Sequence, residues 1–420
     1  MSDLVEYVRK QFPALEIKVN GFPAAFLDGP GGYQVPTCVL EALNDYLISR
    51  NANAGGAFLT SRRTDETLQS ARETFADFFN CTAEEVAFGA NMTTLSFALA
   101  QAMIRQMNAG DKVLITQMDH EGNRSPWADL AQRGIVVEDV AVDKSACTLD
   151  MNDFKSKLTD NTRVVACNWA QNAVGTISDI GPVIRMAHEV GAITVVDAVH
   201  YAAHQPTDVQ AIDTDFLICS AYKFFGPHIG ILYGKREVFK KLQPLRVATQ
   251  KAYPPYMIET GTLNHEGIAG ARAAVEFVAD IGSKFGNSSE IQDRVKNLSG
   301  RRRDIVAGLL VFDDYEQPLT NYLIEGLSDI PELTLYGPPA NHPRTSTVSF
   351  THKTSPAPEI AQYLAEKGLF VWAGDFYAAS MIDVLGLRER GGLVRIGIAP
   401  YNTRAELDRL IEAMQKFESK

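Results

Sequence analysis

A lysine follows a short apolar run in the segment FLICSAYKFFG, residues 216–226. Lysine is rare among apolar and aromatic residues unless its long stem carries the amine out to water or the amine reacts. Removing the amine from water lowers its pKa, and the neutral amine is the nucleophilic form. Lys223 is therefore a candidate for a covalent bond to a carbonyl compound.

Polar side chains follow four apolar runs of the sequence, including the one before Lys223. The segments are TQMDH with His120, NWAQN with Asn172, VVDAVH with Asp197 and His200, and ICSAYK with Ser220, Tyr222 and Lys223. The apolar runs predict strands, and ligands of open α/β sheets bind where such strands end. Each residue alone could be a helix cap or a core residue, but their shared position predicts one site.

The turn GANMTT, residues 89–94, lies between a predicted strand and a predicted helix. Free backbone N–H groups at a helix N-terminus form a natural phosphate site. A phosphate site, a carboxylate, a ring that can stack and a desolvated lysine together suit pyridoxal 5′-phosphate (PLP). In this interpretation Lys223 forms a Schiff base with the cofactor, and Asp197 keeps the pyridine nitrogen protonated.

The elements that must position these residues alternate along the first two-thirds of the chain. Predicted strands span 84–89, 111–116, 134–142, 162–170, 192–199 and 215–221, and predicted helices include 91–107 and 179–191. Strands that are apolar on both faces and separated by helices indicate an α/β fold with a mostly parallel sheet. Residues 230–235 follow Lys223 too closely for a crossover helix, so we expect an antiparallel strand there.

The sequence changes in character after a long predicted helix at 268–282. Three spaced strands are predicted at 345–352, 369–374 and 393–400, and a capping box of Thr403 and Glu406 begins the last helix. We therefore predict a large domain of residues 19–282 and a smaller α+β domain formed by residues 1–18 and 283–420.

The composition is that of a globular protein, with 45% hydrophobic and 22% charged residues among 420. A net charge of −11 argues against nucleic acid or an anionic membrane as the main partner. The absence of a long apolar run, of a signal-peptide pattern and of CxxC spacing among five cysteines leads us to expect a cytoplasmic protein. No GxGxxG follows the early strands, which argues against a nucleotide-dependent oxidoreductase.

Three spaced motifs suggest a family: NGFPAAFLDGPGG (20–32), ETGTLN (259–264) and VRIGIAPYNT (394–403). With the lysine and aspartate segments in the same order, the chain resembles the class-V aminotransferase family of fold-type-I PLP enzymes. Within that family it is most similar to the cysteine desulfurase group. The resemblance implies a PLP-dependent transferase fold and a homodimer with shared active sites.

The resemblance also implies a role for each site residue. Lys223 would form the Schiff base, Asp197 would pair with the pyridine nitrogen, and His120 would stack on the ring. Asn172 and His200 would face the phenolic oxygen, Asn91, Met92, Ser220 and Tyr222 would hold the phosphate, and Thr262 would reach the phosphate of the neighbouring subunit. Arg395 would bind the substrate carboxylate. The family more often has Gln at His200, Thr-Thr at Asn91-Met92 and His at Tyr222.

The chain departs from the desulfurase pattern R-x-G-H-H-C-A, which carries a nucleophilic cysteine. The matching stretch, VWAGDFYAA (371–379), has Tyr377 at the cysteine position, Asp375-Phe376 at the two histidines and Trp372 at the arginine. No cysteine lies beyond residue 219, and a phenol with a reference pKa of about 10 does not replace a thiolate. We therefore expect no persulfide chemistry. We expect Tyr377 to contact the substrate, and Tyr377 or Asp375 could donate a proton to a leaving group. Both could instead be solvent-facing loop residues.

Desulfurases usually have His-Arg where this chain has Gly55-Gly56. The two glycines indicate either a roomier substrate pocket or simply a turn.

The expected substrate is a small amino acid, and several reactions are open to it. Removal of the Cα proton by a lysine can lead to loss of a β-substituent, to transamination or to racemisation. Transamination of a dicarboxylic partner usually needs a second cation, and Trp372 stands where the family has one. We therefore expect a desulfurase-like lyase that cleaves a β-substituted amino acid, with a class-V aminotransferase as the alternative. A catalytically inactive PLP-binding regulatory subunit is a lesser alternative.

Overall fold

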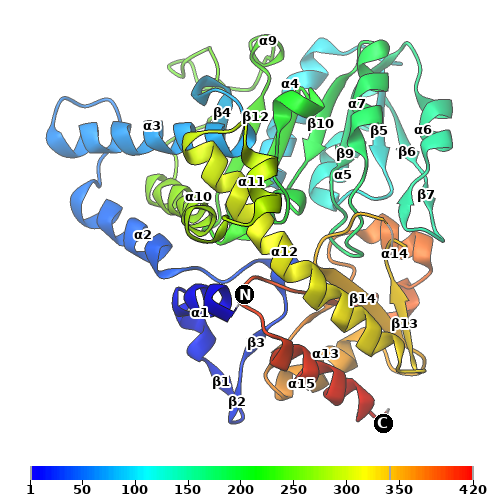
Figure 1. Cartoon of the computed structure of the whole chain (residues 1–420). Coiled ribbons are helices and arrows are strands. Elements are labelled where there is room, and N and C mark those ends of the chain that lie inside the picture. The colour runs from blue at the N-terminus through cyan, green and yellow to red at the C-terminus, as the bar shows by residue number, and fades with distance from the viewer. Residues whose placement is uncertain (1, 340–341, 419–420) are drawn as a thin grey trace.

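A seven-stranded sheet forms the centre of the large domain in the computed structural model, which describes residues 2–339 and 342–418 (Figure 1). Its strand order is β4-β12-β11-β10-β9-β5-β6. The strands are β4 (Val86–Gly89), β5 (Lys112–Thr116), β6 (Val136–Val140), β9 (Thr162–Asn168), β10 (Ile193–Asp197), β11 (Phe216–Ser220) and β12 (Gly230–Gly234). All seven predicted strands are confirmed, with shorter ends. β12 runs antiparallel to β11 and β4, as predicted, and β11, β10, β9, β5 and β6 are parallel.

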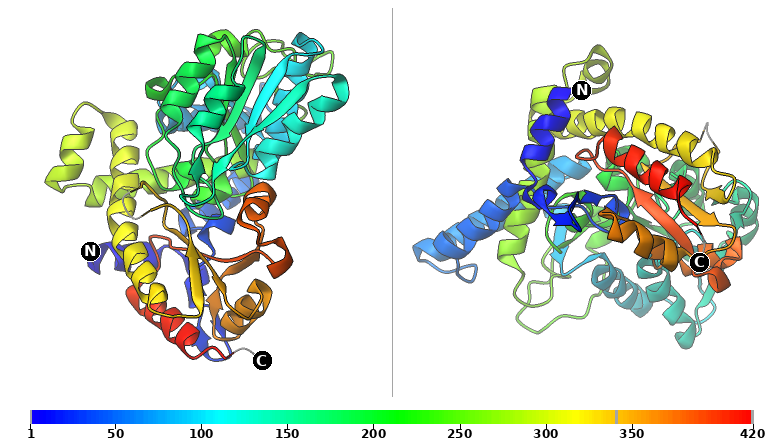
Figure 2. Two further views of the ribbon diagram at one scale, coloured as in Figure 1. Left: turned by 90° about the vertical axis from the view of Figure 1, so that its right-hand side faces the viewer. Right: turned by 90° about the horizontal axis from the view of Figure 1, so that it is seen from below.

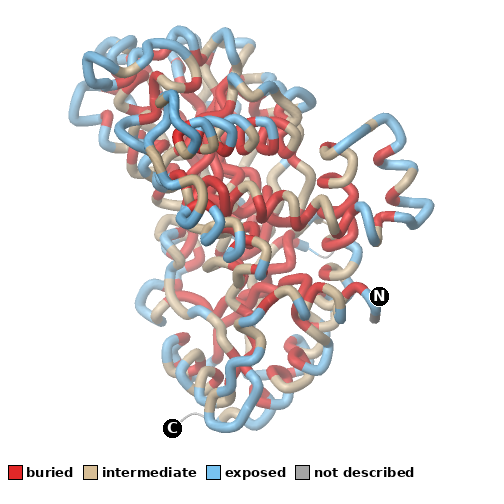
Figure 3. Tube along the Cα trace, turned by 90° about the vertical axis from the view of Figure 1, so that its left-hand side faces the viewer, coloured by how far each residue is buried: buried red, intermediate tan, exposed pale blue. Residues whose placement is uncertain are grey.

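Helices cover both faces of this sheet, which explains why its strands are continuous apolar runs. Side chains of β11 alternate between two hydrophobic clusters: Leu217 and Cys219 pack on one face and Phe216 and Ile218 on the other. The helices are α1 (Ser2–Lys10), α2 (Thr37–Ser49), α3 (Leu59–Phe79), α4 (Met92–Met103), α5 (Glu121–Ala128), α6 (Met151–Lys157), α7 (Ile180–Glu189), α8 (Val209–Ile212), α9 (Arg236–Phe239), α10 (His265–Phe285), α11 (Ser289–Val295), α12 (Gly300–Ser328), α13 (Ala357–Glu366), α14 (Ala379–Leu385) and α15 (Arg404–Gln415). Figure 3 shows buried segments running through the interior, with exposed turns around them.

A second, four-stranded antiparallel sheet lies below the first in Figure 1 and in the left view of Figure 2. Its order is β13 (Leu333–Tyr336), β14 (Thr347–His352), β17 (Leu393–Gly397) and β16 (Trp372–Gly374). The sequence predicted three strands here and missed β13. The prediction of one strand over 369–374 was wrong, because β15 (Leu369–Phe370) pairs with β3 (Ala25–Phe26) whereas β16 pairs with β17. Hydrophobic alternation does not show that a chain changes partner within two residues.

Two helix starts have the caps that their sequences indicate. Asn91 caps α4, because its side-chain oxygen accepts a hydrogen bond from the Thr94 N–H at 2.9 Å. The predicted capping box of Thr403 and Glu406 is confirmed at the start of α15. The cap at α4 matters for function because it places the helix N-terminus at the carboxyl ends of the central strands.

The long helix α12 joins the two sheets. It packs against α10 beneath the large sheet and continues to β13, β14 and α15 on the small one (Figure 2). At its contact with α10 the two backbones touch: a Cβ atom on Gly282 would overlap the carbonyl oxygen of Asp304, and one on Gly308 would overlap that of Val278. The division into domains at residue 282 stays a prediction.

Among residues 2–339 and 342–418, no helix combines the length and hydropathy that a membrane crossing needs.

Candidate active site

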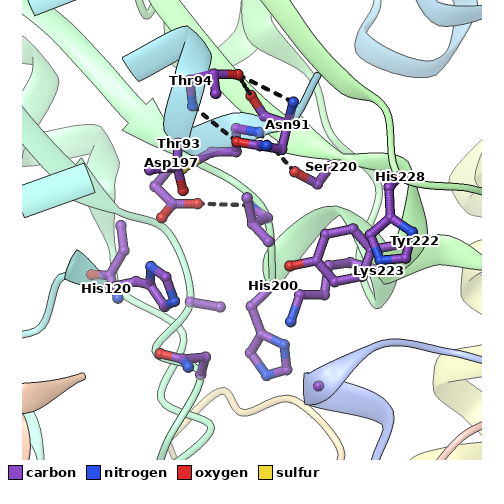
Figure 4. A pocket seen from close by; sticks show the side chains of 16 residues that line it. Asn91, Thr93, Thr94, His120, Asp197, His200, Ser220, Tyr222, Lys223 and His228 are labelled. Atoms are coloured by element: carbon purple, nitrogen blue, oxygen red, sulfur yellow. Dashed lines mark hydrogen bonds between the residues drawn. The ribbon is translucent and has the colours of Figure 1, made fainter. Parts of the chain in front are cut away.

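A cavity of about 590 Å³ lies where β9, β10 and β11 end and α4 begins (Figure 4). Nine of the predicted site residues line it: Asn91, Met92, His120, Asn172, Asp197, His200, Ser220, Tyr222 and Lys223. The parallel strands explain this convergence, because their carboxyl ends meet at one edge of the sheet.

Lys223 lies in the 3-10 turn Ala221–Phe224 that follows β11, and its side chain points into the cavity. Its Nζ donates a hydrogen bond to the carbonyl oxygen of Pro30 and lies 4.9 Å from the ring centroid of Tyr222. The surrounding protein lowers the pKa of Lys223 to about 7 by desolvation, and the Arg395 cation acts in the same direction. A large fraction of the amine is therefore neutral and nucleophilic near neutral pH.

Asp197 is the last residue of β10 and is 5% exposed. The Val199 N–H donates a hydrogen bond of 2.9 Å to its Oδ1. Burial raises the pKa of Asp197 to about 6, although the Val199 hydrogen bond and Lys223 act against that shift. A carboxylate buried at the floor of a cavity needs a cationic partner, and a protonated ring nitrogen is such a partner.

The N-terminus of α4 forms the opposite wall (Figure 4). The Met92 N–H donates to Ser220 Oγ at 2.9 Å, which ties the helix start to the end of β11. Thr93 and Thr94 also line the cavity. Gly230 allows this approach, since a Cβ there would lie 2.5 Å from the Asn91 carbonyl carbon. Helix N–H groups and hydroxyls around one space suit a phosphate.

Two histidines face the cavity from different sides. His120 caps α5, with its Nδ1 accepting the Gly122 N–H at 2.9 Å, and burial lowers the pKa of its ring to about 4. His200 Nε2 lies 2.9 Å from the Thr345 hydroxyl and 3.0 Å from that of Thr347, at the start of β14. Burial lowers the pKa of His200 well below its ordinary value. Both rings are therefore neutral, and His200 links the cavity to the small sheet.

Arg395 on β17 adjoins the cavity and is 4% exposed. Its Nη1 donates to the backbone oxygen of Asn172 at 3.1 Å, and its guanidinium carbon lies 4.1 Å from the Phe376 ring centroid. Two buried atoms here lack a hydrogen-bond partner among the described residues: Arg395 Nε and Asn172 Oδ1. An unsatisfied buried polar atom costs about 1–3 kcal/mol, so both atoms point to ligands that supply an anion and a hydrogen-bond donor.

The sequence model of the family described as Aminotransferase class-V matches residues 25–299 and 307–410. The chain belongs to this family. It is 30% identical to cysteine desulfurases of Pectobacterium carotovorum, over 99% of this chain and 98% of the relative, and of Yersinia pseudotuberculosis, over 100% and 99%. Its structure resembles an apo cysteine desulfurase from Thermococcus onnurineus, with a TM-score of 0.85, 26% identity and coverage of 98% and 97%. An Escherichia coli cysteine desulfurase shares the fold, with a TM-score of 0.82, 24% identity and 98% coverage of both chains.

Members of the class-V family are PLP-dependent enzymes, so this protein is a PLP-dependent lyase or aminotransferase with the fold that the sequence predicted. The residues present suit the cofactor: the α4 N-terminus for the phosphate, Asp197 for the ring nitrogen, the unpartnered Asn172 Oδ1 for the phenolic group and Lys223 for the aldehyde. When bound, PLP supplies an electron-withdrawing ring that stabilises negative charge at the substrate Cα.

Four residues singled out in the sequence, Thr262, Tyr377, Gly55 and Gly56, do not line the cavity of this class-V enzyme. Thr262 lines two neighbouring hollows instead. Tyr377 is 70% exposed, and its ring centroid lies 5.6 Å from that of His120. Gly55 and Gly56 form a turn: the Gly55 N–H donates to the Asp65 carboxylate, and Gly55 has a φ of +85°. The interpretation of these glycines as a turn therefore holds within this chain.

Sequence reasoning missed several lining residues: Gly31, Thr93, Thr94, Asn168, Ala170, Val199 and His228. It also missed Asp28, a partly buried carboxylate whose pKa is raised to about 6 by burial, while Arg395 and Lys223 act against that shift. Asp28 and Gly31 belong to the FLDGPGG motif, and Thr93 and Thr94 to NMTT. Both motifs were recognised, but a motif alone does not show which of its side chains face the ligand.

The rate at which the cofactor-free enzyme captures PLP should rise with pH and level off above about 8, because the neutral amine attacks the aldehyde and the pKa of Lys223 is about 7. Stopped-flow absorbance at a series of pH values measures this rate. A lysine with an ordinary pKa would give a rate that still rises near pH 10. Arg395→Ala should move the plateau to higher pH, since the Arg395 cation helps to lower this pKa.

Proposed function

We propose that this PLP-dependent enzyme is a lyase that removes the sulfur substituent from a β-substituted amino acid such as a cysteine conjugate, and that it forms no enzyme persulfide. The observation that carries the proposal concerns the cysteines. All five lie in the described part of the chain, and none lines the cavity. Burial raises the pKa of each of the five thiols, so none is a ready thiolate nucleophile.

The residues of the site supply what an elimination needs. Arg395 offers its unpartnered Nε to the substrate carboxylate, and Lys223, once free of the cofactor, takes the Cα proton. The Cα–H electron pair becomes a Cα–Cβ double bond as the Cβ–S bond breaks. The sulfur leaves with its bonding pair and is protonated to a thiol. Water then converts the released enamine to pyruvate and ammonia, which balances the reaction without an oxidant.

The direct experiment incubates the holoenzyme with S-methyl-L-cysteine and S-benzyl-L-cysteine, without an added keto acid. We expect pyruvate, ammonia and thiol in equal amounts, measured by lactate dehydrogenase coupling, glutamate dehydrogenase coupling and a thiol reagent. Mass spectrometry of the alkylated enzyme after incubation with cysteine should show no added sulfur. Product formed only with a stoichiometric amino acceptor would mean an aminotransferase, and a persulfide on any cysteine would reject the proposal.

The expected homodimer also belongs to this proposal. Thr262 lies outside the cavity of its own chain, which is compatible with a role in a second copy. Apolar side chains on α2 and at the start of α3 support an interface, because Ile48 is 84% and Phe58 60% exposed.

A further inference from the structure

Three aromatic side chains lie beside the cavity, on strand β16 of the small sheet or just after it. We call Trp372, Phe376 and Tyr377 the aromatic rim. Trp372 is 52% exposed and Tyr377 70%, which is unusual for large rings beside a buried polar site. Their positions make them candidates for contact with a part of the substrate that extends out of the cavity.

Each ring of the rim contacts a different part of the site. Tyr377 lies 5.6 Å from His120 between ring centroids, with an interplanar angle of 34°. Phe376 covers the guanidinium of Arg395. Trp372 lies on Gly31, because a Cβ on that glycine would be 2.5 Å from Trp372 Nε1. The rim is therefore continuous with the cavity.

Hydrogen bonds hold the rim in one arrangement. Asn172 Nδ2 donates to the Phe376 carbonyl at 3.0 Å, and the Glu121 N–H donates to the Tyr377 carbonyl at 2.7 Å. The Tyr377 N–H donates to Asp375 Oδ1 at 3.0 Å. Phe376 and Tyr377 have φ values of 57° and 56°, a conformation that residues with a Cβ adopt only when their surroundings impose it. The backbone that carries Phe376 and Tyr377 is thus held in place.

The charges around the rim limit which substituents it can accept. The Asp375 carboxylate belongs to the same loop, because its Oδ1 accepts the Tyr377 N–H at 3.0 Å. The Arg395 cation is covered by Phe376 on one face and is assigned to the substrate carboxylate. An anionic substituent would thus meet a carboxylate and aromatic rings, whereas a neutral aromatic group could stack on them.

We propose that the aromatic rim binds the β-substituent of the substrate and selects a neutral aromatic one, as in an S-benzyl or S-aryl cysteine. With the carboxylate on Arg395 and the amine beside Lys223, the substituent lies toward His120 and Tyr377. Turnover of such a substrate rests on the proposed lyase function. Binding of its aromatic substituent by the aromatic rim does not depend on that function. Two exposed rings form too small a surface for a protein partner, which usually covers about 800 Å² on each side.

The test measures binding of two amino acids that lack sulfur and cannot be eliminated. They are 2-amino-5-phenylpentanoate, which matches S-benzylcysteine, and 2-aminopentanoate, which matches S-methylcysteine. Titration of the holoenzyme, followed by cofactor absorbance or calorimetry, gives both dissociation constants. We expect the phenyl compound to bind about 10-fold or more tightly than the propyl compound, and Tyr377→Ala to remove most of that ratio. Tyr377→Phe should keep it.

Phe22→Ala is the matched control, because Phe22 is a 46% exposed ring on the separate hairpin of β1 (Lys18–Val19) and β2 (Phe22–Pro23). It should leave the ratio as in the wild type. Equal affinities of the wild type for the two compounds, or a ratio that Tyr377→Ala and Trp372→Ala both leave intact, would overturn the proposal. Failure of elimination alone would reject the lyase function and leave this binding preference standing.

Discussion

Lys223→Ala should lower turnover by about 10²–10⁴-fold or more, because it removes both the amine that holds the cofactor and the base that takes the Cα proton. Borohydride reduction of the wild-type holoenzyme should fix the mass of the reduced cofactor on the peptide that contains Lys223. The variant should show no such adduct and should lose the absorbance of the lysine-bound cofactor. Peptide mass spectrometry and an absorbance spectrum measure both effects.

Lys235→Ala provides the matched control for this change. Lys235 is half-buried and pairs with Asp213 at 2.6 Å, away from the cavity, so its loss should leave the spectrum and the turnover near wild type. If Lys223→Ala kept the absorbance of the wild-type holoenzyme, the assignment of Lys223 would be wrong.

Asp197→Asn should lower turnover by about 30-fold to several-thousand-fold, which corresponds to the roughly 2–5 kcal/mol lost when one partner of a buried charge pair is removed. The amide has nearly the shape of the carboxylate but cannot hold a proton on the pyridine nitrogen by its charge. We expect cofactor capture by Lys223 to continue, so that kcat falls while borohydride still fixes the adduct. Steady-state kinetics on the reconstituted variant separate these effects.

Asp139→Asn makes the same chemical change in the same sheet, at a half-buried carboxylate of the edge strand β6 that pairs with Arg124 away from the cavity. It should affect turnover less than twofold. Equal activity of Asp197→Asn and the wild type would show that Asp197 does not face the ring nitrogen.

The convergence of the site could be predicted because it follows from topology. Strands that are apolar on both faces must be covered on both sides, and their parallel arrangement brings Asn172, Asp197 and Ser220 to one edge. The sequence could not predict that β15 pairs with β3 whereas β16 pairs with β17. Phe370 and Trp372 are both large apolar residues, so the hydrophobicity pattern does not distinguish their strands.

Several features of the site depend on packing between distant segments. Asp28 lies near Arg395 and Lys223 only because the segment after β3 runs between the two sheets. The hydrogen bonds of His200 to Thr345 and Thr347 join residues about 145 positions apart. No local propensity encodes such contacts, and side-chain direction at a loop such as 375–377 depends on the same distant partners.

The touching backbones of α10 and α12 set how closely these two helices approach each other. Gly282 and Gly308 are far along the chain from every catalytic candidate, yet α12 carries the small sheet with Arg395 and the aromatic rim. A methyl group at either glycine would overlap the backbone of the other helix and force the two helices apart. Substitution of either glycine should therefore disturb the support of the site without changing any residue that lines the cavity.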